Sequence, residues 1–79
     1  MRTFSGSLLR AQRTRCGLSA SQLAARVGKS PWAVYDWEQG RAQPPIPVAD
    51  AVADALGVTL DALLADNQTA ARRRQAVAV

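Results

Sequence analysis

The 79-residue sequence contains no histidine and a single cysteine. Histidine is the commonest general base and the commonest metal ligand, so its absence removes most routes to acid–base and metal-dependent catalysis. The sequence also offers no pairing of a nucleophile with a base and no cluster of metal-ligating residues. We therefore expect no enzymatic activity, no cofactor, no metal and no small-molecule ligand. A lone cysteine cannot close an intramolecular disulfide, which indicates a reducing compartment.

Long apolar runs and alternating patterns are missing as well. No stretch approaches the roughly 20 apolar residues of a membrane-spanning helix, and the first residues are not followed by the apolar segment of a signal peptide. No segment alternates apolar and polar residues for long enough to predict a strand. Because 48% of the residues are hydrophobic, the chain can still fold. We expect one small all-α domain in the cytoplasm, without membrane association.

Charge is distributed unevenly along the chain. Residues 1–41 contain seven basic residues against two acidic ones, whereas residues 42–66 contain four aspartates and no basic residue. Residues 67–79 add three consecutive arginines. A basic first half is typical of a surface that binds a polyanion. Arginines that merely solubilise exposed helix faces would give the same pattern, so charge alone leaves both interpretations open.

Glycines and prolines divide the chain into helix-sized segments. Ser19 and Gln22 have the spacing of a capping box, and Ser30 followed by Pro31 is a typical helix start. The prolines between residues 43 and 47 indicate an extended connector. We expect five helices, at about residues 7–15, 19–27, 31–38, 48–56 and 59–64.

Apolar residues at helical spacing predict which positions face the core. Cys16 is interpreted as one of them, a small buried hydrophobe. The last helix carries three leucines that either complete the core or form a dimer surface, namely Leu60, Leu63 and Leu64. The other expected core positions are Leu8, Leu9, Leu23, Ala24, Val27, Val34, Trp37, Ile46, Ala49, Val52, Ala53 and Leu56.

The second and third segments are separated by a three-residue turn that contains Gly28. This spacing predicts a helix–turn–helix, in which glycine permits the sharp corner and the second helix is presented to a groove of DNA. Ala24 is small because the two helices cross closely there, and Val34 and Trp37 pack below the crossing.

Three stretches of sequence resemble the phage repressor/Cro-like (XRE-type) helix-turn-helix family. They are residues 17–30 (GLSASQLAARVGKS), residues 37–41 (WEQGR) with Pro44, and residues 53–64 (ADALGVTLDALL). The resemblance extends over about residues 7–65 without a gap. It implies a compact five-helix bundle of the lambda-repressor-like type.

The resemblance also implies a division of the chain. A helix-turn-helix DNA-binding domain is expected at residues 1–66. Residues 67–79 lack a clear apolar stripe, so we expect a basic, flexible tail that is frayed or ordered only by a partner. The arginines at residues 72–74 of this tail are either simply solvated or an arm that touches phosphate.

Individual residues receive roles from the same resemblance. Arg13 and Glu38 stand where the family often has an ion pair that ties the first helix to the third. The residues expected to face the bases are Lys29, Ser30, Pro31, Trp32, Tyr35 and Asp36. Contacts to DNA phosphates are expected from Ser19, Ser21, Arg26, Gln39, Arg41 and Gln43.

Five positions depart from the family pattern. Ala20 stands where glutamine often contacts DNA, and Gln12 stands where an apolar residue is usually buried. Pro31 and Trp32 replace polar residues that commonly read base edges, and Trp32 either packs on a thymine methyl group or folds back onto the protein. Asp36 either accepts a hydrogen bond from a cytosine amino group or repels phosphate.

These features predict a sequence-specific regulator of transcription that binds double-stranded DNA, most simply as a repressor, by inserting residues 31–38 into the major groove. A single module buries little surface, so we expect a homodimer on two half-sites. The alternative is a module that binds a protein partner, such as the antitoxin of a toxin–antitoxin pair that also represses its own gene. Three residues favour this alternative, namely Ala20, Trp32 and Asp36. Alanine at residue 20 lacks the glutamine contact to DNA, exposed tryptophan is typical of interfaces, and a carboxylate repels DNA.

Overall fold

Four α-helices and a 3₁₀ helix form the protein in a computed structural model, which describes residues 2–66. The predictions for the tail at residues 67–79 lie outside the described residues. The elements follow the chain in the order β1 (Arg2–Phe4), α1 (Gly6–Arg15), α2 (Ala20–Val27), α3 (Pro31–Gln39), α4 (Ile46–Leu56), the 3₁₀ helix η1 (Leu60–Leu63) and β2 (Leu64–Asp66).

Serine side chains begin the first three helices. The hydroxyl oxygens of Ser5, Ser19 and Ser30 accept hydrogen bonds from backbone N–H groups three residues ahead, at 3.1–3.3 Å. The Gln22 side chain accepts in return from the Ser19 N–H at 2.8 Å, which completes the predicted capping box. Capping satisfies donors that have no partner within the helix, so these helix starts are fixed locally.

The predicted helical fold is confirmed, and the two ends of the described chain add a short antiparallel sheet that the sequence did not predict. Thr3 of β1 lies opposite Ala65 of β2, and Phe4 lies opposite Leu64. The Ser5 N–H continues this pairing with a 2.8 Å hydrogen bond to the Leu63 carbonyl. Strands of three residues are too short to show an alternating pattern, and each exists only because the other end of the chain lies beside it.

The fifth predicted helix is a single 3₁₀ turn, which corrects the count of five α-helices. Thr59 occupies its N-cap position but makes no side-chain capping bond. Leu64, directly after the turn, is already extended, with φ −109° and ψ 142°. Residues 64–66 are extended and pair with β1, so η1 ends after four residues.

Helix α4 begins at Ile46, two residues earlier than expected. The prolines did not prevent this, because Pro45 precedes the helix and Pro47 lies in its first turn, where no N–H is needed. Ile46 itself is 65% exposed, so its predicted place in the core is wrong. A side chain in the first turn of α4 projects beyond the neighbouring helices that would cover it.

Every helical element contributes at least one apolar side chain to the core, and α4 contributes four. Leu9, Leu23, Val34, Val52 and Leu63 are fully buried and come from α1, α2, α3, α4 and η1 in turn. The prediction for Trp37 is confirmed, since only 6% of this residue is exposed. Cys16, in contrast, is exposed beyond the end of α1, and its thiol donates to the Leu56 carbonyl at 3.3 Å. Its predicted burial is wrong because the chain already turns away from the core at this residue.

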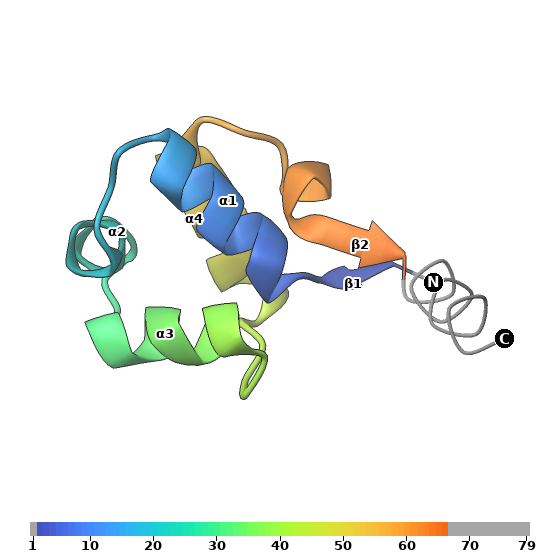
Figure 1. Cartoon of the computed structure of the whole chain (residues 1–79), viewed down its shortest axis with the longest axis horizontal. Helices are drawn as coiled ribbons and strands as arrows, with labels where there is room; N and C mark the ends of the chain where they lie inside the picture. Colours follow the sequence, from blue (N-terminus) through green and yellow to red (C-terminus); the bar gives the residue numbers. More distant parts are fainter. Residues whose placement is uncertain (1, 67–79) are drawn as a thin grey trace, which may run out of the picture.

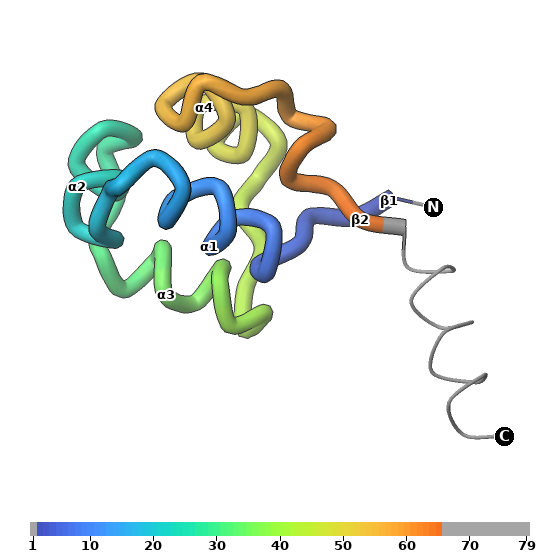
Figure 2. Tube along the Cα trace, turned by 45° about the horizontal axis from the view of Figure 1, so that its top comes forward, coloured from blue at the N-terminus to red at the C-terminus, as the bar shows by residue number. Residues whose placement is uncertain are grey.

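Helix α1 lies in the middle of the bundle, with α4 on one side and α3 on the other (Figures 1 and 2). Helix α2 closes one end and packs on both α3 and α4. Strands β1 and β2 extend from the opposite end (Figure 1). None of the helices in residues 2–66 is long and apolar enough to cross a membrane. This arrangement leaves α3 on the outside of the molecule.

Candidate nucleic-acid interface

The turn between α2 and α3 is a sharp corner of three residues. Gly28 has a φ of 69°, in the left-handed region that glycine enters without a steric penalty. The next N–H, that of Lys29, closes the turn with a 2.9 Å hydrogen bond to the Ala24 carbonyl. Ala24 is only 1% exposed in the contact between the two helices. The predicted helix–turn–helix is therefore present, and its corner fixes how α3 is presented.

An ion pair joins α1 to the last turn of α3. Arg13 Nε lies 2.5 Å from Glu38 Oε2, and Arg13 Nη2 lies 3.2 Å from Glu38 Oε1. Arg13 Nη1 also donates to the Leu18 carbonyl at 2.8 Å. The side chains of Arg13 and Glu38 are only 15% and 7% exposed. This two-point contact fixes α3 against the rest of the fold.

The electrostatic state of the pair is set by the same contacts. The hydrogen bond to the Glu38 carboxylate raises the pKa of Arg13 above its ordinary value, and this effect exceeds the lowering by burial. The contact with Glu38 therefore favours the cationic form of Arg13. The ion pair between Arg13 and Glu38 thus holds the helix that carries the candidate DNA-facing residues against α1.

Two aromatic side chains stand on the outward face of α3. Trp32 is 76% exposed and Tyr35 is 43% exposed. Their rings meet edge to face, with centroids 6.1 Å apart and planes at 61°. Trp32 therefore does not fold back onto the core, and its contact with a thymine methyl group stays a prediction. Such a pair presents an apolar surface on the outward face of α3.

Asp36 and Arg41 form an ion pair beside these rings. Arg41 Nη1 lies 3.2 Å from Asp36 Oδ1, and the side chains are 66% and 45% exposed, respectively. From the sequence, Asp36 was expected to face a base and Arg41 to contact a phosphate, and their pairing was not predicted. The sequence feature that could have predicted this ion pair is Gly40. Its φ of 78° reverses the chain, so Arg41 returns to the last turn of α3.

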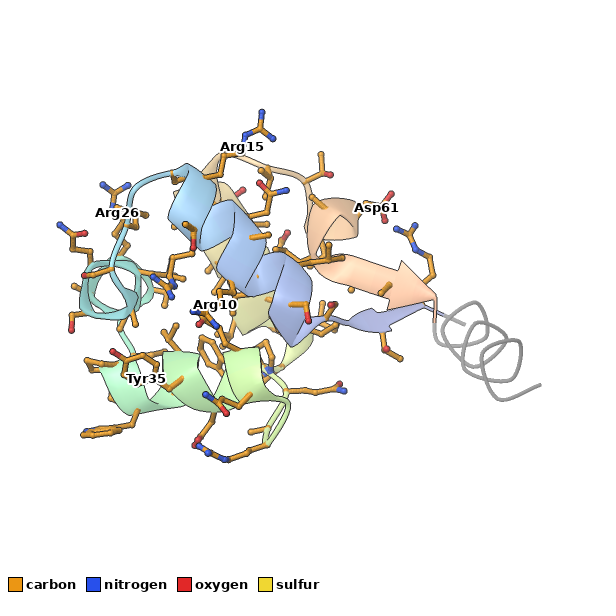
Figure 3. All side chains as sticks on the ribbon, viewed as in Figure 1. Arg10, Arg15, Arg26, Tyr35 and Asp61 are labelled. Carbon is orange, nitrogen blue, oxygen red and sulfur yellow. The ribbon has the colours of Figure 1, made fainter. Side chains whose placement is uncertain are left out.

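The remaining residues expected at the interface lie on or beside α2 and α3. The hydroxyls of Ser19 and Ser30 are used in helix capping. Pro31 is half-buried. Arg26 and Tyr35 lie at the end of the molecule formed by α2 and α3, far from Asp61 beside the sheet (Figure 3). The other members are exposed, namely Ser21, Lys29, Gln39 and Gln43.

Two positions differ from what the family pattern suggested. Ala20 is 3% exposed and belongs to the core, so this residue supports the fold and presents nothing to a ligand. Arg10 was not foreseen as a site residue, yet it is exposed on α1 and lines a shallow depression next to Glu38. Only the packing of α1 beside α3 places it there (Figure 3).

The predicted dimer surface is only partly exposed. Leu63 is fully buried, which corrects its place in that surface. Leu60 and Leu64 are half-buried. Leu60 and Leu63 are three residues apart and share one face of the 3₁₀ turn, with Leu60 at the edge of the bundle, whereas Leu64 is already extended. Within residues 2–66, no group of three or more His, Cys, Asp or Glu side chains is placed to hold a metal.

Comparisons with known proteins place this geometry in context. A family model described as helix-turn-helix (HTH_3) matches residues 9–63, more than two thirds of the chain. A comparison with curated protein sequences found no match. Among solved structures, the P22 c2 repressor in complex with the synthetic operator 9T is similar, with 29% identity and a TM-score of 0.70. The similarity covers 73% of this chain and 88% of the repressor chain.

Chains of an enzyme contain a similar domain. The hydroxypropylphosphonic acid epoxidase from S. wedmorenis is 26% identical with a TM-score of 0.72, over 76% of this chain and 32% of the epoxidase. Fe(II)-HppE with an alternative substrate gives 26% identity and a TM-score of 0.73, over 82% of this chain and 35% of that one. This chain thus spans about a third of the length of these relatives. The family match, the left-handed corner at Gly28 and the exposed α3 lead to one conclusion: the chain belongs to the XRE-type helix-turn-helix family of DNA-binding transcription regulators.

Proposed function

We propose that this protein is a sequence-specific regulator that binds double-stranded DNA by inserting α3 into the major groove. The observation that carries the proposal is the outward face of α3, which stays free while the opposite face is fixed by Trp37 and by the Arg13–Glu38 pair. A helix held rigidly on one side and exposed on the other is what groove insertion requires. The family match over residues 9–63 supports the same proposal.

Contacts on both sides of α3 would set its register on the duplex. The N-terminus of α2, with Ser19 and Ser21, is suited to a phosphate because the capping box leaves the N–H groups of Ala20 and Ser21 without a partner within the helix. Arg26, Gln39, Arg41 and Gln43 would touch the phosphate backbone nearby. These contacts position the domain but carry no sequence information by themselves.

Base readout would fall to the exposed side chains of α3 and the preceding turn. Trp32 offers an apolar surface for a thymine methyl group, and Tyr35 supports the indole edge to face. Asp36 offers an acceptor to a cytosine amino group. Lys29 and Ser30 add donors at the start of the helix, whereas Pro31 contributes shape alone.

We further propose that the protein acts as a homodimer and represses transcription by occluding a promoter. One domain buries little DNA surface, and two copies on half-sites about one helical turn apart would supply the missing affinity. Leu60 and Leu64, half-buried at the edge of the fold, remain candidates for the contact between copies. The P22 c2 repressor, whose solved structure includes an operator, supports the repressor role. The proposal includes no catalytic activity, cofactor or small-molecule ligand, and it places the protein in the cytoplasm.

The proposal is tested by selecting bound sequences from a pool of random duplexes at two salt concentrations. The wild type should enrich a palindromic site. Arg41→Ala should weaken binding to the enriched site, because a phosphate contact is lost there. Trp32→Ala should change the preferred site. Arg2→Ala is the matched control, since Arg2 also pairs with an aspartate, Asp61, but at the sheet end of the molecule.

A second candidate function is docking of a protein partner, as in an antitoxin that also represses its own gene. The observation that favours it is the 76% exposure of Trp32, a residue type that is enriched at the centre of interfaces. The epoxidase chains add that domains of this shape also occur within enzymes. Failure of the selection to enrich any site, with binding lost at moderate salt, would favour this candidate and reject the first.

A further inference from the structure

Asp36 is unusual because it places a negative charge on the face of α3 that would meet DNA. Residues 2–41 contain two acidic side chains. Glu38 is 7% exposed and is taken up by Arg13, so it presents little charge to a ligand. Asp36 is 45% exposed and shares its surface with Trp32 and Tyr35. A carboxylate at this place repels phosphate wherever no group of the DNA donates to it.

The backbone holds the partner of Asp36 in place. The N–H groups of Arg41 and Ala42 both donate to the Asp36 carbonyl, at 2.9 and 3.4 Å. The left-handed Gly40 makes this return possible, with a φ of 78°. The Arg41 side chain therefore starts next to Asp36 in the free protein, and its 3.2 Å ion pair follows from the turn. Because of this geometry, a change in the contacts of the Arg41 side chain also changes those of the Asp36 side chain.

Two arrangements are open to this pair when a duplex approaches. If the pair persists, Asp36 cancels the charge of Arg41, and Arg41 displaces no counterion from the backbone. If Arg41 turns to a phosphate, the Asp36 carboxylate is left without a partner in the negative potential of the groove. It then needs a donor from a base edge. Cytosine N4 supplies one, whereas adenine places the N7 acceptor beside its amino group and guanine and thymine offer acceptors.

We propose that Asp36 determines specificity by ion-pair exchange, an inference that rests on the proposed DNA-binding function. At a site with cytosine facing Asp36, the carboxylate accepts from the base and Arg41 is released to a phosphate. On other sequences, Asp36 keeps Arg41 neutralised and the domain binds weakly. Asp36 thus links a base contact to a backbone contact that has no sequence preference of its own.

The test measures dissociation constants of the full chain on the selected duplex and on a scrambled duplex over a series of salt concentrations. Asp36→Asn keeps the shape of the side chain and removes its charge, so Arg41 is free on every sequence. On scrambled DNA we expect about three- to tenfold tighter binding and a log–log salt slope steeper by about 0.9, which corresponds to one more phosphate. On the selected duplex binding should not tighten, so the ratio between the two sites falls.

Three further measurements isolate the exchange. Asp36→Asn made together with Arg41→Gln should leave the salt slope of Arg41→Gln unchanged, because no arginine remains to be released. Asp50→Asn removes the same charge from the exposed surface of α4 and should change binding to either duplex less than twofold. Replacing the cytosine that faces Asp36 should weaken the wild type about tenfold and the Asp36→Asn variant much less. Thermal unfolding of each variant checks that it is folded.

Each other result overturns the inference in a recognisable way. Binding to neither duplex by the wild type rejects the proposed function, and the exchange with it. Binding that Asp36→Asn leaves unchanged in affinity and slope on scrambled DNA rejects the exchange alone. Equal tightening by Asp36→Asn with and without Arg41 also rejects it, because the carboxylate would then act by direct repulsion.

Discussion

The Arg13–Glu38 pair allows a quantitative prediction about what fixes α3. Removing one partner of a buried ion pair costs about 3–5 kcal/mol, because the other charge is left without compensation. The 15% and 7% exposures of the two side chains allow some relief by water, so we expect about 3 kcal/mol for Glu38→Leu. Domains have roughly 0.05–0.15 kcal/mol of stability per residue, or about 3–10 kcal/mol for residues 2–66. This single change should therefore remove a large part of the total.

Replacing Arg13 should lower the free energy of unfolding more than replacing Glu38 does. Arg13→Met leaves the Glu38 carboxylate buried and also removes the donor to the Leu18 carbonyl. The second loss adds about 1 kcal/mol. The double variant Arg13→Met/Glu38→Leu removes both charges and fills the space with apolar atoms of similar volume, so most of the loss should be recovered. We expect a coupling energy of at least about 2 kcal/mol between the two sites.

The assay is urea unfolding followed by far-UV circular dichroism, with all four proteins measured at one ionic strength. The raised pKa of Arg13 means that its stabilising contribution is complete below the unfolded pKa of arginine and is lost only as the pH rises through the higher folded value. The stability difference between the wild type and Arg13→Met should hence be constant from about pH 6 to about pH 9. Single variants that each lose less than about 1 kcal/mol and combine additively would refute the reasoning, since that is the behaviour of an exposed pair.

Two further substitutions, at Gly6 and Gln12, probe the packing of α1, and Gly57→Ala at the end of α4 is the control. Gly6→Ala should destabilise by about 2 kcal/mol, although alanine is the better helix former, because the new Cβ would meet the backbone carbonyls of Trp37 and Glu38. Gly57→Ala should cost only about 1 kcal/mol, because its Cβ meets open space and only the φ of 69° is unfavourable. Equal melting temperatures for the wild type and Gly6→Ala would contradict the close approach of α1 to α3. Gln12→Leu should raise stability by about 1 kcal/mol, because the Gln12 Oε1 atom is buried without a hydrogen-bond partner among the described residues. A lower denaturation midpoint for Gln12→Leu would show instead that the amide is satisfied in solution.

Local signals in the sequence were sufficient for the helix–turn–helix. The capping box of Ser19, the proline after Ser30 and the turn at Gly28 each act within a few residues. Their physical basis is the need to satisfy free backbone groups at helix ends and the freedom of glycine at positive φ. The burial of Trp37 was predictable from a second local signal, because its spacing from Val34 is that of one helical face.

Contacts between distant parts of the chain were not readable in this way. Strand β1 is defined only by pairing with β2 at the other end of the described chain, and the extended Leu64 shortens η1 to one 3₁₀ turn. Ile46 and Cys16 are apolar residues at helical spacing, yet both are exposed because they lie at helix ends where no other element covers them. Periodicity reports which face a residue shares, but not how far the covering elements extend.

The candidate site, too, was predictable from the sequence only in part. The sequence by itself determined that a short helix would follow a glycine corner and carry Trp32, Tyr35 and Asp36, because residue spacing along a helix fixes which side chains share a face. Only the tertiary structure decided which of them are available. It leaves Trp32 in solvent, buries Ala20, and brings Arg41 back to Asp36 through the turn at Gly40. These outcomes depend on the packing of α1, α2 and α3 and on hydrogen bonds in the turn, which act through space and leave no periodic trace in the sequence.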